Sequence, residues 1–446
     1  MSKIKALIMA AGLGERLRPL TDRVPKCLAP IGPRPLLDYW LESLIACGMR
    51  EVVINTHAHR AEMQRYIHAV NQRGGIRIKE SYEPRLLGTA GTITANHAYL
   101  SDADRVVIIY ADNFSNLDLR EMLAFHQGKQ AQMTMLLFRT EDPRRCGIVQ
   151  LDETGRITSF VEKPHAPIGD LANGGVYIIE KSLLSRIAAM AASDLGHDVL
   201  PQLHGDIFGW IFDGYHRDIG THSSYARAQR EAPAVLAARG YFADGTRRCV
   251  FLDRDGTLLE QVHYLKDPAL VRVLPDSAAA INRLRRHGFA CVVVTNQSQL
   301  GNNLLNEAQL ADIHEEMYRQ LVAEGAMLDA LYYCSWPGRQ RDRTIVEHPD
   351  RKPGPGLLIR AAQELGLRLQ DSWMIGDMVS DVLAGTNANC CGSILLRSGK
   401  ELMPEEFAVA RRYPQANTLT HAVDQVLKHS FAAQREAQAQ LTATCA

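Results

Sequence analysis

The sequence of 446 residues has no charge excess, no long apolar run and no cysteine framework. Lysine plus arginine and aspartate plus glutamate each number 50, so the overall charge favours neither a nucleic acid nor a membrane surface as a partner. Because no run of about 20 apolar residues occurs, we expect no bilayer span. The first apolar run, residues 4–11, is too short for a signal peptide and is typical of a buried strand. We therefore expect a cytoplasmic location.

The nine cysteines are odd in number and scattered, and no CxxC pair occurs among them. This spacing does not fit a disulfide framework. With 46% apolar and 22% charged residues, the composition is that of an ordinary globular protein, and the length favours two or three domains. Because the net charge is zero, any anionic ligand must be held by local clusters of residues.

Two segments share one design, in which a short apolar strand runs directly into a turn rich in glycine or aspartate. The first strand ends before Gly12-Leu13-Gly14, and the second, residues 249–252, ends before Asp253-Arg254-Asp255-Gly256-Thr257. Strand and helix patterns alternate after both segments, which predicts an α/β fold with two Rossmann-like α/β/α domains of three layers. Ligands bind beyond the carboxyl ends of strands in such sheets, so each segment is expected to open a catalytic domain.

The domain boundaries follow from the same patterns. We expect a first domain at residues 1–230 and a second at 248–400. The segment 231–247 contains alanine, proline, glycine and charge with little strand character, and it is expected to be a helical linker. Residues 401–446 carry no motif and are expected to form a helix and a disordered tail.

Glycine and basic residues follow the first strand at spacings that favour a phosphate site. Ala11, Gly12 and Gly14 precede Arg16 and Lys26. Glycines let backbone N–H groups approach phosphate oxygens, and the positive side chains neutralise a triphosphate. A tight structural turn would also contain the glycines, but the two basic residues favour phosphate binding.

These residues resemble the start of the sugar nucleotidyltransferase family, and the resemblance runs from Lys5 to about Ala228. Further motifs stand in the expected order: Leu87-Gly88-Thr89-Ala90-Gly91, Asp112 after a strand, Glu162-Lys163-Pro164, Asn173-Gly174-Gly175 and Asp218-Ile219-Gly220-Thr221. In this family an oxygen of a sugar 1-phosphate attacks the α-phosphorus of a nucleoside triphosphate, and pyrophosphate leaves. Charge builds on the transferring group, so catalysis depends on positioning and electrostatics.

The resemblance implies a role for each motif. Arg16 and Lys26 would be the catalytic residues that hold the triphosphate and stabilise the departing pyrophosphate. The other implied positions are the Mg²⁺ ligands Asp112 and Asp218, the sugar or sugar-phosphate contacts Glu162, Lys163 and Asn173, and the nucleotide contacts Ala11, Gly12, Gly14, Glu83, Gly88 and Thr89. Three simpler interpretations stay open: Asp112 as a helix N-cap, Asp218 as a turn residue, and Lys163 as a solvated surface lysine.

The identity of the base depends on Glu83, which the resemblance places at the base edge, five residues before Gly88. A carboxylate only accepts hydrogen bonds, and guanine offers adjacent N1–H and N2–H donors. GTP is therefore favoured, with a surface glutamate in a loop as the alternative.

The second strand-end turn begins a different set of motifs. It reads DxDGT, and it is followed by Thr295-Asn296 after a strand, Lys352-Pro353 in a loop, and Gly376-Asp377-Met378-Val379-Ser380-Asp381 after another strand. Together they resemble the haloacid-dehalogenase (HAD) superfamily of phosphatases, from about Cys249 to Arg397.

The residue types fit an aspartyl-phosphate mechanism. Asp253 would be the nucleophile, and Asp255 would protonate the leaving alcohol and then activate water. Thr295, Asn296 and Lys352 would contact the substrate. Mg²⁺ would bind the Asp253 carboxylate, the Asp255 carbonyl and Asp377, with Asp381 as an orienting residue.

The gaps between these motifs leave no room for a large cap domain, and the motifs resemble the capless branch with histidinol phosphatases and D-glycero-D-manno-heptose 1,7-bisphosphate phosphatases. Arg351 would then clamp a second phosphate, unless it is a surface arginine. A zinc loop of this branch would need four ligands, and only Cys334 and His348 remain here, so zinc is not expected. Residues 299–303 lack a basic residue, and Met378 stands where a lysine often follows the motif aspartate.

We therefore expect a bifunctional enzyme that dephosphorylates a sugar bisphosphate, with heptose 1,7-bisphosphate as the candidate, and then joins the sugar 1-phosphate to an NTP. An alternative is a cytidylyltransferase and phosphatase pair acting on a polyol phosphate such as glycerol phosphate. A third hypothesis is that one half of the chain is not an enzyme but a degenerate scaffold or binding module. The expected partners are the small-molecule substrates and a second copy of the chain in a homo-oligomer.

Overall fold

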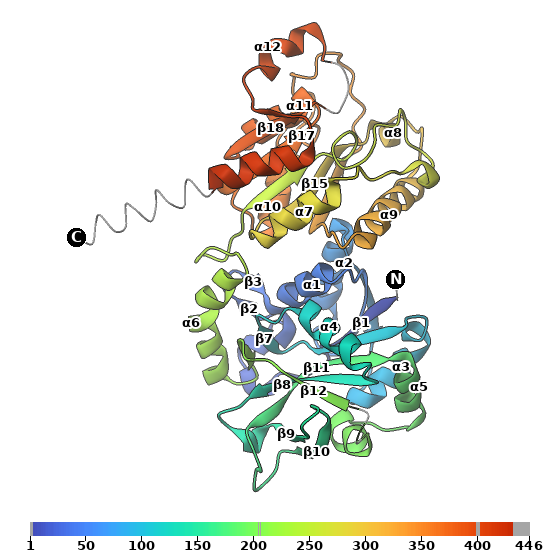
Figure 1. Cartoon of the computed structure of the whole chain (residues 1–446), viewed down its shortest axis with the longest axis vertical. Helices are drawn as coiled ribbons and strands as arrows, with labels where there is room; N and C mark the ends of the chain where they lie inside the picture. The colour runs from blue at the N-terminus through green and yellow to red at the C-terminus, as the bar shows by residue number, and fades with distance from the viewer. Residues whose placement is uncertain (1–2, 204, 206, 398–401, 431–446) are drawn as a thin grey trace, which may run out of the picture. The chain divides into compact units, whose positions relative to one another are not determined.

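The computed structural model (Figure 1) describes residues 3–203, 205, 207–397 and 402–430 and separates into two compact units, Met1–Arg239 and Gly240–Ala446. The division lies within the segment expected to be a linker, but helix α6 (His222–Ala238) occupies the first half of that segment as part of the first unit. The tail expected beyond residue 430 lies outside the described residues. None of the described helices combines the length and the apolar composition that crossing a bilayer requires.

The first unit is built on a mixed sheet of nine strands. The parallel part has the order β6-β1-β4-β5, with bounds Arg105–Tyr110, Ile4–Met9, Glu51–Thr56 and Arg77–Tyr82. The other strands are β8 (Met133–Arg139), β9 (Gly147–Leu151), β10 (Ile157–Glu162), β11 (Leu171–Glu180) and β12 (Ile207–Ile211). Strand β1 lies between β4 and β6, where the chain order reverses, so the carboxyl end of β1 is the expected ligand position.

Both faces of this sheet are covered. On one face, Leu7 of β1 packs with Ile93 of helix α3 (Thr89–Leu100) and Leu184 of helix α5 (Lys181–Ala189). Ile8, which points to the opposite face, is also fully buried. The remaining helices of the unit, besides α6, are α1 (Leu36–Ala46), α2 (Arg60–Arg73) and α4 (Leu119–Lys129).

The second unit contains a parallel sheet of six strands in the order β16-β15-β14-β17-β18-β19. Their bounds are Ala330–Cys334, Ala290–Asn296, Cys249–Leu252, Trp373–Gly376, Gly392–Leu396 and Gln415–Ala416. The labelled helices are α7 (Ser277–Arg286), α8 (Ser298–Gly301), α9 (Glu307–Ala323), α10 (Gly356–Leu365), α11 (Val379–Asn387) and α12 (Phe407–Ala410), and a further helix includes residues 419–430. Strand β14 lies between β15 and β17, so the second unit also has a switch point.

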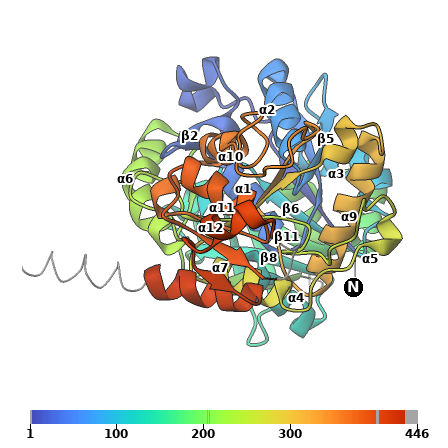
Figure 2. The same cartoon turned by 90° about the horizontal axis from the view of Figure 1, so that it is seen from above.

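Alternate residues of β14 belong to two different hydrophobic cores. Val250 and Leu252 pack in a cluster with α7, α9 and a helix of residues 419–430, which is red in Figures 1 and 2. Cys249 and Phe251 pack with α10 on the other face. The unit therefore has the three α/β/α layers that the alternating pattern predicts.

Candidate active sites

The loop after β1 is fixed by a side chain from the neighbouring strand. Asn55 of β4 accepts hydrogen bonds at Oδ1 from the backbone N–H groups of Ala10 (2.6 Å) and Ala11 (3.3 Å). Its Nδ2 donates to Glu83 Oε1 (3.0 Å). Asn55 therefore links the glycine loop to the residue expected at the base edge. It belongs to no motif, and its only sequence signal is a polar residue near the end of an apolar strand.

A cavity of about 250 Å³ lies beside this loop, and five of the six expected nucleotide contacts line it. They are Ala11, Gly12, Glu83, Gly88 and Thr89. Gly14 is not among the lining residues. Its φ of 66° lies in the left-handed region, and a Cβ there would lie 2.9 Å from Thr21 Cγ2. The turn itself therefore requires glycine, and the expected nucleotide contact of Gly14 stays a prediction.

Glu83 is 2% exposed, so it is not a surface glutamate in a loop. Its Oε1 accepts from Asn55 and from Thr92 Oγ1 (2.6 Å), and its Oε2 accepts from the backbone N–H of Leu87 (3.1 Å). Carboxylate oxygens have further acceptor capacity beyond these three bonds. The carboxylate is thus fixed in the wall of the cavity, where a ligand with N–H donors can reach it.

Lys26 brings the two expected Mg²⁺ ligands of the first unit together. Its Nζ lies 2.8 Å from Asp112 Oδ2 and 2.8 Å from Asp218 Oδ1. Strand β13 (His216–Asp218) pairs with β7 (Asn113–Ser115) and so places Asp218 beside the residue after Asp112. Burial opposes protonation of Lys26, but the two carboxylates outweigh it and raise the pKa of the lysine. Two carboxylates at one point are oxygen ligands of the kind that Mg²⁺ prefers.

A larger cavity of about 940 Å³ extends from this cluster and shares Thr89 and Asp112 with the first cavity. Its lining includes the remaining expected residues of the first unit: Arg16, Glu162, Lys163, Asn173 and Asp218. Lys163 Nζ lies 3.3 Å from Glu162, and the lysine side chain is 62% exposed. This exposure leaves room for a ligand phosphate and is also typical of a surface lysine, so the role stays a prediction.

Asn173 is partly occupied within its own strand. Its Nδ2 donates to the Tyr177 hydroxyl (2.6 Å), and its Oδ1 accepts from the backbone N–H of Gly175 (3.0 Å). Nearby, His216 Nε2 donates to the carbonyl of Gly174 (2.8 Å) and the ring lines the same cavity. Burial lowers the pKa of His216 to about 4. The sequence offered no motif for this histidine, which holds the glycine pair in place.

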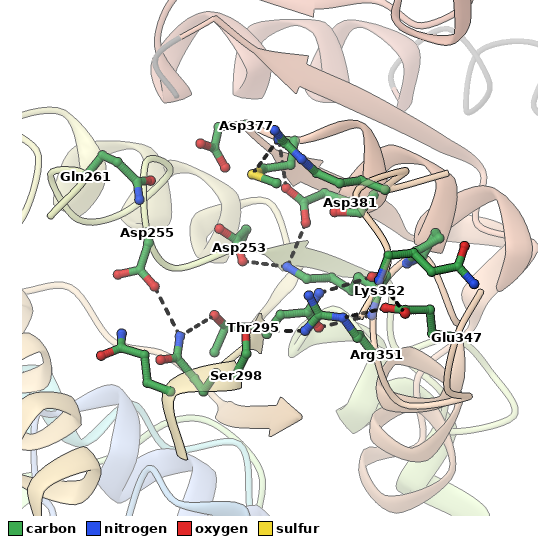
Figure 3. A pocket seen from close by; sticks show the side chains of 18 of the residues that line it. Asp253, Asp255, Gln261, Thr295, Ser298, Glu347, Arg351, Lys352, Asp377 and Asp381 are labelled. Atoms are coloured by element: carbon green, nitrogen blue, oxygen red, sulfur yellow. Dashed lines mark hydrogen bonds and ion pairs between the residues drawn. The ribbon is translucent and has the colours of Figure 1, made fainter. Parts of the chain in front are cut away.

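In the second unit, Lys352 joins two buried carboxylates. Its Nζ lies 2.5 Å from Asp253 Oδ1 and 2.7 Å from Asp381 Oδ1, and it also donates to the Val294 carbonyl (2.7 Å). Figure 3 shows the ammonium group between the two aspartates. An ammonium group has three donors, so Lys352 is saturated by protein acceptors. Burial disfavours its charged form, but both aspartates raise its pKa.

Asp377 completes the acidic cluster. One ligand atom each from Asp253, Asp377 and Asp381 lie within 4.8 Å of one another, the only such group of three found among the described residues. Both Asp377 oxygens are buried, and neither has a hydrogen-bond partner in the described parts of the chain. Burial and then the neighbouring aspartates raise the pKa of Asp377. A buried carboxylate without a partner is unfavourable, so these oxygens fit a divalent cation such as Mg²⁺.

Asp255 lines the same cavity as Asp253, as expected, and one of its oxygens is held by protein donors. Oδ2 accepts from Arg254 (2.8 Å) and from Gln297 Nε2 (3.1 Å), and Gln297 also donates to Thr295 Oγ1 (2.9 Å). Oδ1 has no hydrogen-bond partner among the described residues. Protein donors therefore orient Asp255 through Oδ2, and its expected role in proton transfer stays a prediction. Arg254 lies within the DxDGT motif and Gln297 directly follows Thr295-Asn296, but sequence reasoning assigned this function to neither.

Asn296 and Arg351 line the same cavity as Asp253, and both have protein partners. Asn296 donates to the Lys352 carbonyl (3.1 Å) and accepts from the Lys352 N–H (3.0 Å), so it positions the lysine loop. Asn296 also lines the cavity that contains Asp253, so its expected substrate contact stays a prediction. Arg351 lines the cavity of about 280 Å³ with its side chain 21% exposed, which does not fit a surface arginine. Its donors already face the Trp336 carbonyl (3.1 Å) and Glu347 (3.6 Å).

Cys334 and His348, the two remaining positions of the zinc pattern, have protein partners. Cys334 Sγ accepts from the backbone N–H of Trp336 (3.4 Å), and the His348 ring stacks on Trp336 with 4.8 Å between centroids. His348 Nδ1 accepts from the backbone N–H of Asp350 (3.1 Å). Cys334 thus lies at the end of β16, and His348 lies in the loop before Lys352.

Comparison with known proteins identifies two regions of the chain. A family model for nucleotidyl transferases matches residues 5–234, and a model described as HAD-hydrolase-like matches residues 350–422. Mannose-1-phosphate guanylyltransferase from Mycobacterium tuberculosis is 31% identical over 53% of this chain and 69% of its own length. The catalytic subunit beta of mannose-1-phosphate guanylyltransferase from Danio rerio is 33% identical over 49% of this chain and 61% of its own.

Among solved structures, HddC from Yersinia pseudotuberculosis complexed with GMP-PN is 23% identical, with a TM-score of 0.45, and the match covers 52% of this chain and all of that one. The first family model covers more than half of the chain. The matches confirm the predicted combination of a nucleotidyltransferase with a HAD-like phosphatase. The chain therefore belongs to the nucleotidyl transferase family, and a HAD-like hydrolase domain follows its nucleotidyltransferase domain.

Proposed function

We propose that the chain catalyses two successive steps in the synthesis of a guanosine diphosphate sugar. The second unit removes one phosphate from a sugar bisphosphate, with heptose 1,7-bisphosphate as the candidate. The first unit then joins the sugar 1-phosphate to GTP and releases pyrophosphate. The proposal rests on the presence, in one chain, of two clusters in which a lysine contacts two carboxylates: Lys26 with Asp112 and Asp218, and Lys352 with Asp253 and Asp381.

Two observations support guanine as the base. The relatives named above are guanylyltransferases by name. Glu83 adds a fixed carboxylate to the wall of the smaller cavity of the first unit, and guanine has the two adjacent donors that such a carboxylate can accept. The same relatives act, by name, on mannose 1-phosphate, and a heptose of the manno configuration has the same ring stereochemistry. A manno-configured sugar 1-phosphate is therefore the proposed second substrate.

In the transferase, the described side chains would bind and orient the reacting phosphates. Asp112 and Asp218 would hold Mg²⁺, which neutralises charge on the phosphate oxygens when it is bound. Lys26 would then exchange its carboxylate contacts for the phosphates, and Arg16 would contact the departing pyrophosphate. Lys163 would contact the phosphate of the sugar.

In the phosphatase, the Asp253 carboxylate would attack phosphorus, and the ester oxygen would leave with a proton from Asp255 Oδ1. Water would then attack the aspartyl-phosphate, lose a proton to Asp255 and release inorganic phosphate and free Asp253. Lys352 and Thr295 would hold the phosphoryl oxygens. Asp253 and Asp377 would hold Mg²⁺, which offsets the repulsion between carboxylates and phosphate.

The test is to incubate the whole chain with heptose 1,7-bisphosphate, Mg²⁺ and each of GTP, CTP, UTP, ATP and dTTP. We expect phosphate release with every nucleotide, and pyrophosphate with a sugar nucleotide from GTP alone. Phosphate release without any sugar nucleotide would remove the coupled pathway. Pyrophosphate release from CTP with glycerol phosphate, and not from GTP with the sugar, would establish the polyol alternative instead.

A further inference from the structure

The phosphatase cavity contains a guanidinium group that the mechanism above does not use. Arg343 lies in the loop between β16 and α10 and lines the same cavity as Asp253 and Lys352. Its Nη1 lies 3.5 Å from Met378 Sδ. Because Met378 directly follows Asp377 in the chain, the guanidinium group stands next to the end of the acidic cluster. The loop therefore supplies a positive charge where the motif itself has a neutral methionine.

A buried carboxylate from a distant part of the sequence fixes this arginine. Glu406 is fully buried, and its Oε1 lies 3.4 Å from Arg343 Nε. Its other oxygen accepts from the backbone N–H of Met403 (2.9 Å). A buried carboxylate requires a cation or several donors nearby. Glu406 and Arg343 are therefore mutually dependent, and the arginine is held at the cavity wall although its side chain is 24% exposed.

The donors of Arg343 are only partly used. A guanidinium group has five N–H donors, and the contacts found in the described residues are one carboxylate beyond ordinary hydrogen-bond length and one thioether, which is a weak acceptor. Lys352, in contrast, has three strong acceptors. Arg351 is oriented by Glu347 and the Trp336 carbonyl. Of these cations in the cavity, Arg343 has the greatest unused capacity to bind an anion.

We propose that Arg343 binds the second phosphate of the substrate, at the end remote from the ester that reacts at Asp253, and makes the site selective for sugar bisphosphates. This inference rests on the proposed phosphatase function and names its substrate class. The planar fork of an arginine matches two phosphate oxygens. Selection arises because only a bisphosphate supplies a second phosphate to the guanidinium donors that Glu406 and Met378 leave unused.

The test compares wild type with Arg343→Gln on heptose 1,7-bisphosphate and on p-nitrophenyl phosphate, which has no second phosphate. We expect KM for the bisphosphate to rise by about 10- to 100-fold, as loss of a charged hydrogen bond implies. The kcat for the bisphosphate should change by less than about threefold, and kcat/KM for p-nitrophenyl phosphate by less than about threefold, because neither depends on the second phosphate. Arg343→Lys should have a KM for the bisphosphate between those of Arg343→Gln and wild type.

Arg341→Gln is the matched control, because Arg341 is exposed, lies two residues earlier and does not line the cavity. The kcat and KM of this control should match those of wild type with both substrates. If Arg343→Gln lowers kcat/KM equally for both substrates, or changes kcat/KM for neither, the assignment is overturned.

A binding measurement separates this inference from the proposed function. In the Asp253→Asn protein, calorimetry should detect the bisphosphate, and adding Arg343→Gln should weaken its binding by a similar factor. If wild type hydrolyses neither substrate, the phosphatase proposal fails. Weakened binding would then still support the assignment of Arg343 as an anion site, and unchanged binding would overturn it.

Discussion

At the scale of single residues, both sites depend on a lysine that contacts two carboxylates. Without a cation, Asp112 and Asp218, or Asp253 and Asp381, would repel each other. The two lysines differ in exposure and in saturation. Lys26 is 11% exposed and contacts two carboxylates, whereas Lys352 is 2% exposed and has three acceptors. We therefore expect Lys26 to move onto substrate phosphates more readily than Lys352.

Replacing Lys26 by methionine should remove transferase activity. The change keeps a long flexible side chain but deletes the positive charge, so pyrophosphate release from GTP and sugar 1-phosphate should fall by about 100-fold or more. Phosphate release by the second unit should stay within about twofold of wild type. Lys129→Met is the control, because Lys129 contacts only the Thr154 carbonyl at an exposed position among the described polar contacts. Equal loss in both variants would contradict the assigned role.

His216 predicts an acid sensitivity of the first unit. Burial lowers the pKa of His216 to about 4, whereas an unfolded histidine has a pKa of about 6.5. The contribution of neutral His216 to the free energy of unfolding is complete above pH 6.5. It is lost as the pH falls toward 4, because in this range only the unfolded chain takes up the proton. Between pH 7 and pH 5 this amounts to about 2 kcal/mol.

The matched variant is His216→Gln, which keeps a side-chain donor for the Gly174 carbonyl and has no charge at either pH. Urea unfolding followed by fluorescence should show a smaller loss of stability between pH 7 and pH 5 in the variant. If wild type and variant lose the same free energy of unfolding, His216 is not the sensitive group.

At the scale of elements, the start of α3 depends on a glycine. Gly88 has a φ of 77°, and a Cβ there would lie 2.3 Å from the Ser193 carbonyl oxygen. That oxygen accepts from the first N–H groups of the helix, at Ala90 (3.0 Å) and Gly91 (3.3 Å). Gly88→Ala should therefore destabilise the first unit by about 2–4 kcal/mol and reduce nucleotidyl transfer.

A second glycine provides the control for this change. Gly128 lies in α4, is exposed, and a Cβ there would meet no atom within 4 Å. Gly128→Ala should leave activity intact and stabilise the unit by up to about 1 kcal/mol. Thermal unfolding and pyrophosphate release measure both variants. Similar stability for the two alanine variants would show that the contact with Ser193 does not constrain the helix start.

The local patterns of the sequence predicted much of both sites, because parallel strands place their carboxyl ends at one edge of a sheet. That rule was sufficient to place Asp253 and Asp377 together. It could not reveal contacts between distant segments, such as Asn296 with Lys352 or Arg343 with Glu406. Such pairs depend on how the loops pack against each other, which neither a periodic pattern nor a motif in the sequence can predict. Nor could the sequence show that Gly14 is required by its turn, since a glycine needed for a turn looks the same as one that contacts phosphate.

At the scale of the whole molecule, the described residues that line each site come from one unit. The transferase residues lie between Ala11 and Asp218, and the phosphatase residues lie between Asp253 and Glu406, on either side of the division after Arg239. No described residue of one site contributes to the lining of the other. The two activities should therefore be separable by single substitutions.

This separation predicts complementation between two inactive proteins. Asp253→Asn should form the sugar nucleotide from GTP and sugar 1-phosphate but not from the bisphosphate, and Lys26→Met should release phosphate from the bisphosphate without forming the sugar nucleotide. A mixture of equal amounts should convert bisphosphate and GTP fully to the sugar nucleotide after a lag, because the sugar 1-phosphate diffuses from one protein to the other. If the mixture stays inactive while each variant keeps its remaining activity, the intermediate does not leave the chain, and the two sites must be coupled rather than independent.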